Sequence, residues 1–167
     1  IKLQVRCQDI FSETMIIIGE LINSSRDIIK EKIEKRDTSY LQKLAQKQVD
    51  CGADFIDVNA GAFDQEEIDY LRWLVEIIQV EVDIPLAIDT ANPKALQEAL
   101  KVHRGTPLLN SITAETERFK DMLPLILEYD PQVIALCMDD DGFSRQAKPR
   151  VEIAQKLVEK LKKAGVS

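Results

Sequence analysis

Short apolar segments recur along the chain and predict five β-strands. Each segment is almost continuously apolar, which is typical of parallel strands that are buried on both faces. The spacing between the segments leaves room for one helix after each strand. The predicted strands are MIIIG (15–19), DFIDVNAG (54–61), PLAIDT (85–90), TPLLNS (106–111) and QVIALCM (132–138).

A segment with helical periodicity follows each predicted strand. In the second of these, Leu71, Val75 and Ile78 recur at the spacing that places them on one face of a helix. Asn92 is a natural N-cap for the third helix, and Pro124 predicts a kink or a break in the fourth. The predicted helices span residues 37–52, 64–80, 92–103, 115–129 and 149–163.

Strand and helix therefore alternate five times, which predicts an α/β fold with a parallel sheet covered by helices. Two architectures fit this order, an open doubly wound sheet and a (β/α)8 barrel. Neither GxGxxG nor GxxxxGK[ST] follows a predicted strand, which weighs against a nucleotide-binding sheet. Residues 1–14 have no clear period, so we expect an N-terminal extension before a domain that spans 15–167.

The charge balance argues against several classes of partner. The 167 residues include 22 Lys and Arg against 29 Asp and Glu, a net charge of -7, whereas a nucleic-acid-binding surface is basic. No apolar run reaches the roughly 20 residues that span a bilayer, and no signal-peptide pattern is present. The three cysteines are scattered without CxxC spacing. We therefore expect a cytoplasmic protein with no metal site of its own.

Carboxylates and carboxamides recur at the ends of the predicted strands. The C-terminal ends of parallel strands share one face, where ligands bind. Asp accepts hydrogen bonds and Asn both donates and accepts, so these groups suit a neutral ring that carries N–H donors. No Lys or Arg lies among them, which makes an anionic phosphate a poor fit. They are Glu20, Asn23, Asp57, Asn59, Asp89, Thr90, Asn110, Ser111 and Asp139–Asp141.

Simpler roles compete for some of these residues, because Asp or Asn at a strand end often caps the next helix. Asn92 is better placed than Asp89 to cap the helix that begins at Pro93, which leaves Asp89 for another role. His103, near the end of that helix, is predicted to be a surface residue. Asp139–Asp141 are predicted to form a solvated loop rather than a metal site.

Taken together, five segments in this order and spacing resemble the pterin-binding (β/α)8 barrel family. Within it they are most similar to methyltetrahydrofolate:corrinoid (iron–sulfur) protein methyltransferases, and next to the folate domain of cobalamin-dependent methionine synthase. The resemblance runs from about Met15 to the C-terminus. It is carried by GELIN (19–23), GADFIDVNAG (52–61), PLAIDT (85–90), LLNSITAE (108–115) and VIALCM (133–138).

The resemblance implies a TIM (β/α)8 barrel, of which this chain supplies about the first five βα units, with a pterin in the mouth. Asp89 matches the aspartate that ends the family's third strand, and Asn110 matches the asparagine of the fourth. Both hydrogen-bond the pterin ring in that family. Asn59 falls in the family's D-x-N-x-G segment and would line the pocket. The other implied pocket residues are Asp57, Glu20, Asn23 and Ser111.

The implied reaction moves the N5 methyl group of methyltetrahydrofolate to the cobalt of a corrinoid carried by a partner protein. A tertiary amine is a poor leaving group, so N5 must gain a proton or a strong hydrogen bond. Proximity and orientation then supply much of the rate. The resemblance implies a folate substrate and a corrinoid protein as partners, and a homodimer is an expected assembly because the family's barrels commonly dimerise.

Three other functions remain open. Dihydropteroate synthase shares the pterin pocket, but its T-P-D-S-F segment after the asparagine is absent, because SSRDI follows Asn23. This difference favours methyl transfer over pterin condensation. The second alternative is a non-catalytic partial barrel that binds a folate or a corrinoid protein, and the third is a generic (β/α) enzyme.

The five predicted strands are fewer than the eight of a closed barrel. The family continues with a sixth strand that carries another ring-binding aspartate, and with a seventh-strand asparagine near the methylated nitrogen. Both would lie beyond Ser167. An open sheet of five strands would leave two edges bare, which proteins avoid. We therefore expect a piece of a longer protein, with the proton-handling residue outside it and with weak or no turnover by these residues alone.

Overall fold

The structure is a computed structural model that describes residues 3–4 and 15–166. These residues fall into two compact units, which we name by their ranges. The 15–108 unit is continuous in sequence. The 109–166 unit also includes residues 3–4. Within the described part of the chain, every helix is too short or too polar to cross a membrane.

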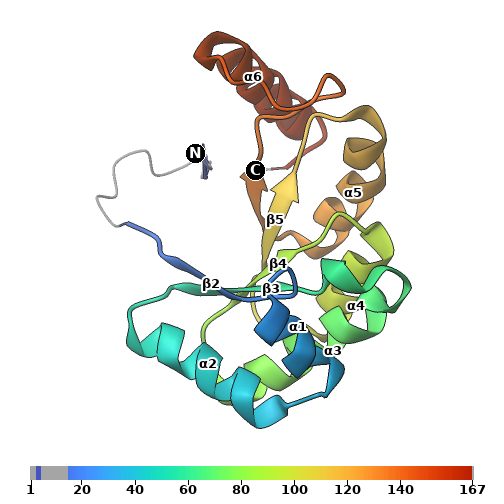
Figure 1. Ribbon diagram of the computed structural model, residues 1–167. Coiled ribbons are helices and arrows are strands. Elements are labelled where there is room, and N and C mark those ends of the chain that lie inside the picture. The colour runs from blue at the N-terminus through green and yellow to red at the C-terminus, as the bar shows by residue number, and fades with distance from the viewer. Residues whose placement is uncertain (1–2, 5–14, 167) are drawn as a thin grey trace. The chain divides into compact units, whose positions relative to one another are not determined.

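The 15–108 unit alternates strands and helices along the chain (Figure 1). Its strands form one parallel arrangement, in which the second strand is central and pairs with both others. Its elements are β2 (Ile18–Asn23), α1 (Asp27–Glu34), α2 (Thr38–Asp50), β3 (Phe55–Asn59), the 3₁₀ helix η1 (Gly61–Glu66), α3 (Glu67–Glu81), β4 (Leu86–Asp89) and α4 (Pro93–Val102). Helix α2 packs against β2 and β3, and α3 contacts both β3 and α4.

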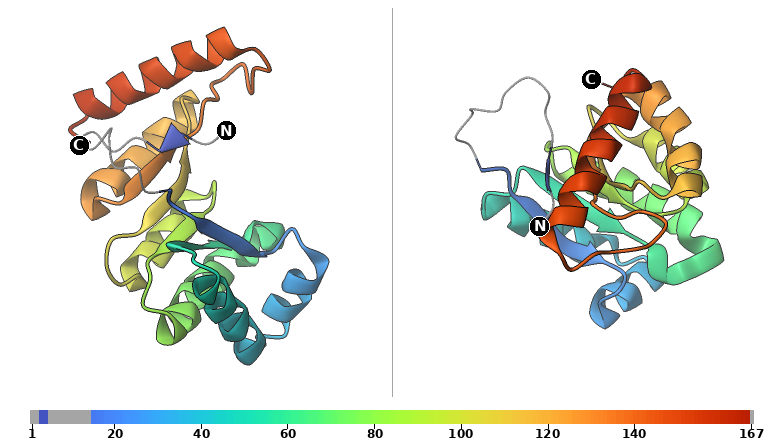
Figure 2. Two further views of the ribbon diagram at one scale, coloured as in Figure 1. Left: turned by 90° about the vertical axis from the view of Figure 1, so that its left-hand side faces the viewer. Right: turned by 90° about the horizontal axis from the view of Figure 1, so that it is seen from above.

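The 109–166 unit begins within β5 (Leu108–Ile112) and continues through α5 (Thr116–Tyr129), β6 (Gln132–Ala135) and α6 (Ala147–Lys163). The two-residue strand β1 (Leu3–Gln4) pairs antiparallel with β6. Just after β6, the backbone N–H of Leu136 donates to the carbonyl of Ile112, the last residue of β5, at 2.9 Å. Helix α6, red in Figure 2, is uninterrupted.

The predicted order of strand and helix is confirmed, and the differences lie at particular elements. The first strand begins at Ile18 rather than Met15 and extends to Asn23. Helix α1 was not predicted, because only Ile29 and Ile33 of its eight residues are buried. Pro124 does not break α5, which continues through it to Tyr129. Strand β6 ends at Ala135. Apart from residues 3–4, the predicted N-terminal extension lies outside the described residues.

The helix caps follow the sequence closely. The side chain of Asp37 accepts a hydrogen bond from the backbone N–H of Tyr40 at the start of α2. The side chain of Asn92 accepts from the N–H groups of Lys94 and Ala95 at the start of α4. Each cap satisfies N–H groups that have no partner inside the helix. The prediction that Asn92, and not Asp89, caps α4 is therefore confirmed.

A β-bulge in β2 decides which way its last residues face. Two residues of β2, Glu20 and Leu21, stand against one residue of β3, Asp57. Because side chains alternate between the faces of a strand, the extra residue moves every later residue of β2 to the opposite face. Without the bulge, Asn23 would share the face of Gly19, which is turned toward the helices. With it, Asn23 lies on the face opposite the helices.

The side chain of Gln48, on α2, stabilises this bulge. Its Oε1 accepts a hydrogen bond from the backbone N–H of Leu21 at 3.0 Å. Gln48 is only 6% exposed, and it can approach the strand because Gly19 has no side chain. A Cβ at Gly19 would lie 2.6 Å from Oε1 and 3.1 Å from Cβ of Gln48. The glycine of the GELIN segment is thus explained by the packing of α2 on β2.

The helix-facing side of β2–β4 forms an apolar core. The residues that alternate onto this side are completely buried, and so are the helical residues that cover them. Burying each large apolar side chain stabilises the fold by about 1.5–3 kcal/mol. The strand residues are Ile22, Ile56, Val58, Leu86 and Ile88, and the helical residues include Leu41, Leu71, Leu74 and Ile78.

His103, predicted to be a surface residue, is half-buried against the start of β4. That prediction is wrong, because the imidazole Nε2 accepts a hydrogen bond from the backbone N–H of Leu86 at 3.1 Å. The carboxamide of Gln79 fixes the next residue by accepting from the N–H of Arg104 at 2.7 Å and donating to its carbonyl at 2.9 Å. Burial of the ring, followed by the charge of Arg104, lowers the pKa of His103 below its usual 6.5.

Replacing Gly19 with Ala should destabilise the protein by about 1–3 kcal/mol, because the new methyl group overlaps Gln48 and pushes α2 from the bulge. Urea unfolding measures this loss. In a Gln48→Ala background the same glycine substitution should cost clearly less, because the closest atom, Oε1 at 2.6 Å, is gone and only the Cβ of residue 48, at 3.1 Å, remains. Equal costs in both backgrounds would show that the close approach of Gln48 is not the cause.

The free energy of unfolding should depend on His103 as the pH falls. The folded state keeps the ring neutral, so His103 contributes its full stability above the unfolded pKa of about 6.5 and loses it as the pH falls from there toward the lower folded pKa. Urea unfolding at several pH values between 7.5 and 5 should therefore show a steeper loss for the natural protein than for His103→Gln. Parallel profiles for the two proteins would contradict the burial of a neutral ring.

Candidate functional site

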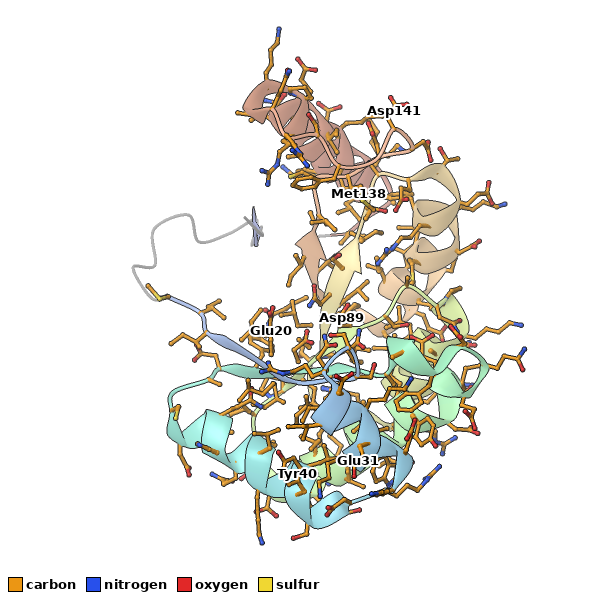
Figure 3. The ribbon with its side chains drawn as sticks, viewed as in Figure 1. Glu20, Glu31, Tyr40, Asp89, Met138 and Asp141 are labelled. Atoms are coloured by element: carbon orange, nitrogen blue, oxygen red, sulfur yellow. The ribbon has the colours of Figure 1, made fainter. Side chains whose placement is uncertain are left out.

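Three polar residues end the three neighbouring strands of the 15–108 unit. Asn23 ends β2, Asn59 ends β3 and Asp89 ends β4, and the register pairs Asn23 with Asn59. Val58 is paired with Ile88, so the residues that follow them are neighbours as well. Because paired residues project from the same face of a sheet, this polar row lies on the face opposite the helices. Figure 3 labels Asp89 at the end of β4.

The carboxamide of Asn59 connects the strand ends. Its Nδ2 donates to the backbone carbonyl and to the carboxylate Oδ2 of Asp89, both at 3.2 Å. Its Oδ1 accepts from the hydroxyl of Ser24 at 2.8 Å and from the backbone N–H of Gly61 at 3.0 Å. Two hydrogen bonds donated and two accepted use the full capacity of a carboxamide. Asn59 therefore fixes the position of Asp89, and its own amide is committed to protein groups.

Ser24 is a member of this network that the sequence analysis missed. It is 1% exposed, and its hydroxyl accepts from the backbone N–H of Ala62 at 3.0 Å while it donates to Asn59. Its own N–H donates to the carbonyl of Asn59 at 3.1 Å. The available signal was a hydroxyl residue directly after a strand that ends in Asn23, a position where Ser commonly bonds neighbouring backbone groups.

The other predicted residues of this unit have different surroundings. Asp57 lies two residues before Asn59 on the same face of β3 and is 1% exposed. Glu20 lies in the bulge of β2, where it is exposed (Figure 3). Asn23 is half-buried, and its Oδ1 accepts from the N–H of Ser25 at 2.9 Å, which turns the chain after β2. The structure thus brings Asn23, Asn59 and Asp89 together, with Asp57 beneath them.

The remaining predicted residues, Asn110 and Ser111, belong to the 109–166 unit. They lie inside β5 and are 4% and 6% exposed. Nη2 of Arg118, on α5, donates to the carbonyl of Ser111 at 2.9 Å and ties the strand to the helix that follows it. Both residues are therefore held by a buried strand rather than by a loop.

The acidic segment Asp139–Asp141 follows β6 and behaves as a capping loop. The carboxylate of Asp140 accepts from the backbone N–H of Thr116 at 2.8 Å and from its hydroxyl at 2.6 Å, at the start of α5. The Thr116 hydrogen bonds hold the pKa of Asp140 below its usual range. Asp141 is exposed. Across residues 3–4 and 15–166, no group of three or more His, Cys, Asp or Glu is arranged to hold a metal ion.

This arrangement suits the recognition of a neutral ligand. Asp89 presents a carboxylate whose position is fixed by a neighbouring carboxamide, at the ends of strands where barrels and open sheets bind ligands. A carboxylate accepts strongly from N–H groups, and hydrogen bonds that involve a charged group are about twice as strong as neutral ones. The 15–108 unit therefore offers a rigid acceptor for the N–H edge of a planar ring.

Comparison with known proteins identifies the family. The sequence profile of pterin binding enzymes matches residues 19–167. Methylcorrinoid:tetrahydrofolate methyltransferase from Eubacterium limosum is 33% identical over 155 residues, which cover 92% of this chain and 57% of that protein. Methionine synthase from Mycobacterium tuberculosis is 24% identical over 151 residues, which cover 87% of this chain and 13% of that protein. The chain thus spans about half or less of the length of these relatives.

Solved structures show the same fold. The 7,8-dihydropteroate synthase of Vibrio fischeri ES114 superposes with a TM-score of 0.66 at 25% identity, covering 100% of this chain and 64% of that one. The dihydropteroate synthase of Yersinia pestis, solved with a pterine-sulfa conjugate, gives a TM-score of 0.64 at 17% identity, covering 91% and 55%. With its five βα units, the chain is part of a TIM (β/α)8 barrel, and it belongs to the family of pterin-binding enzymes.

Proposed function

We propose that the protein is a methyltransferase that exchanges a methyl group between the N5 atom of tetrahydrofolate and the cobalt of a corrinoid protein. The observation that carries the proposal is the fixed position of Asp89 at the end of β4, where Asn59 Nδ2 donates one hydrogen bond to its carboxylate and one to its backbone carbonyl. The E. limosum relative, whose name gives this pair of substrates, supports the choice of reaction.

Asp89 would accept hydrogen bonds from N–H groups of the pterin ring. For Asn110, which belongs to the 109–166 unit, hydrogen bonding to a pterin is proposed from the family resemblance alone. Asn59 acts through Asp89, because its carboxamide is already fully hydrogen-bonded to Ser24, Gly61 and Asp89. We propose that these residues bind and orient the pterin, and that none of them transfers the proton to or from N5. The further residues proposed to contribute to the pterin site are Asp57, Glu20, Asn23 and Ser111.

The exchange is balanced in both directions. When the methyl group leaves N5, the N5–C bond breaks, N5 keeps the electron pair and takes a proton, and Co(I) supplies the pair for the new Co–C bond. In reverse, N5 of tetrahydrofolate attacks the methyl group and loses its proton, and cobalt departs as Co(I). The name of the E. limosum relative gives this second direction. Since both directions share one transition state, the same oriented pterin serves both.

Dihydropteroate synthesis is the rival reaction, because structures of that enzyme share the fold. The curated relatives favour methyl transfer, since they include a methyltransferase that is 33% identical over 92% of this chain and a methionine synthase. The segment after β2 also differs, with SSRDI in place of T-P-D-S-F. Formation of dihydropteroate from a pterin pyrophosphate and p-aminobenzoate, with no methyl transfer, would replace our proposal with this one.

Substituting Asp89 with Asn should weaken the binding of methyltetrahydrofolate about thirty-fold, or about 2 kcal/mol, because hydrogen bonds to a charged acceptor become hydrogen bonds to a neutral one. Calorimetric titration of the protein from the complete reading frame measures the affinity. Methyl transfer is followed in the same preparation by the change in the visible spectrum of a corrinoid protein as its cobalt gains or loses the methyl group.

Asp83→Asn is the matched control, because Asp83 is an exposed aspartate in the loop before β4. It should bind methyltetrahydrofolate as the natural protein does. Equal affinities of the Asp89→Asn and Asp83→Asn variants for methyltetrahydrofolate would contradict the proposed role of Asp89 in pterin binding. Absence of binding by the natural protein would contradict the proposed function itself.

A further inference from the structure

Glu67 is a buried carboxylate just outside the polar row. It begins α3, it is 7% exposed, and both of its oxygens accept hydrogen bonds. Oε1 accepts from the hydroxyl of Thr90 at 2.5 Å, and Oε2 accepts from Nδ2 of Asn92 at 3.1 Å. Thr90 directly follows Asp89. The carboxylate of Glu67 therefore holds residues 90–92, the segment that follows β4, through two hydrogen bonds.

The surrounding hydrogen bonds determine which groups face Glu67. Oδ1 of Asn92 accepts from the N–H groups of Lys94 and Ala95 at 3.1 and 3.4 Å, so the amide of Asn92 must turn its Nδ2 toward Glu67. The Thr90 hydroxyl accepts from the N–H of Asn92 at 3.0 Å, which leaves its hydrogen to donate. Both groups that face Glu67 are thus donors.

Two donors in fixed positions require two acceptors, which a carboxylate has and a carboxamide lacks. A glutamine at this position would turn an NH₂ group toward Asn92, or would leave the Thr90 hydroxyl without an acceptor. A buried donor that loses its partner is costly, because it has already lost its water. The chemistry of the site therefore specifies Glu at position 67.

Glu67 also lies beside the segment that follows β3. A Cβ at Gly61 would be 4.0 Å from its Oε1, and the N–H of Gly61 donates to Asn59 at 3.0 Å. Asp89 is therefore held from two sides. Asn59 bonds the carbonyl and the carboxylate of Asp89, and Glu67 bonds the residues that follow it along the chain.

We propose that Glu67 is a positioning residue for the pterin site. It fixes the backbone after β4, and this keeps the carboxylate of Asp89 at a constant distance from Asn59. This inference rests on the proposed function for its ligand. Glu67 itself does not touch the pterin. Its whole effect passes through the Asp89–Asn92 segment, because both oxygens are occupied by groups of that segment.

Glu67→Gln should raise the dissociation constant for methyltetrahydrofolate about ten-fold in the protein from the complete reading frame. Glu81→Gln is the matched control, because Glu81 is exposed at the other end of the same helix, and it should leave the constant unchanged. Calorimetry reports the affinity and the fraction of binding-competent protein separately. A purely structural role would lower that fraction and leave the affinity of the folded molecules unchanged, and that result would overturn the inference.

A double-mutant cycle with Asp89→Asn separates positioning from general destabilisation. If Glu67 acts through Asp89, the Asp89 substitution should weaken binding less in the Glu67→Gln background than in the natural protein. Additive effects would overturn the inference. Thr90→Val removes the donor to Glu67 at nearly constant volume, and it replaces Glu67→Gln in the same cycle if that variant does not fold.

Hydrogen exchange without ligand gives a test that does not depend on the proposed function. The N–H of Asn92 should exchange faster in Glu67→Gln than in Glu81→Gln, because its acceptor, the Thr90 hydroxyl, is no longer held. Equal exchange would overturn the role of Glu67 whether or not the protein binds a folate. If exchange rises but the natural protein binds no methyltetrahydrofolate, the proposed function fails and Glu67 retains only its effect on the segment.

Discussion

The candidate site of the 15–108 unit depends on one carboxamide, that of Asn59. Parallel strands are held together by backbone hydrogen bonds along their length, but those bonds stop where the strands end. Asn59 continues the connection with its side chain, by bonding Ser24 after β2, Gly61 after β3 and Asp89 at the end of β4. Without it, the end of β4 would lose its side-chain connection to the segments after β2 and β3, and the carboxylate of Asp89 would lose the donor that fixes it.

This carboxamide can act only because the register of β2 brings the right residues to it. The bulge at Glu20 and Leu21 turns Asn23 to the face of Asn59 and lets Ser24 reach it. The bulge in turn depends on Gln48, which satisfies the N–H of Leu21, and on the missing side chain of Gly19. Helix packing on one face of the strands therefore sets the polar row on the opposite face.

The sequence was sufficient to predict the order of strands and helices, because continuous apolar runs indicate buried strands and capped amphipathic segments indicate helices with one buried face. It was also sufficient to pick out Asn23, Asn59 and Asp89, since polar residues at strand ends stand out against apolar runs. Helix α1 and the inward turn of His103 could not be predicted in this way. Helix α1 has only two buried residues, Ile29 and Ile33, to mark an apolar face. The bond from Leu86 to His103 joins segments distant in sequence and leaves no period in the chain.

The roles of individual site residues were harder to predict than their positions. Asn59 and Glu67 both carry groups that bind ligands in other contexts, and only the count of their hydrogen bonds shows that they serve neighbouring protein groups. Glu67 gave no signal at all, because a glutamate in the first turn of a helix is expected from the helix dipole alone. Its partners, Thr90 and Asn92, come from a different strand–helix connection.

Two carboxylates thus flank the same short segment and have opposite surroundings. Glu67 is 7% exposed, and both of its carboxylate oxygens accept hydrogen bonds from protein donors. Asp89 is half-buried at the ends of the strands, and Asn59 anchors its Oδ2 and its backbone carbonyl. A carboxylate that is buried and bonded on both sides can hold a backbone in place, whereas one that is anchored but partly exposed can meet a ligand. The different roles that we propose for Asp89 and Glu67 follow from that difference in burial and not from the residue types.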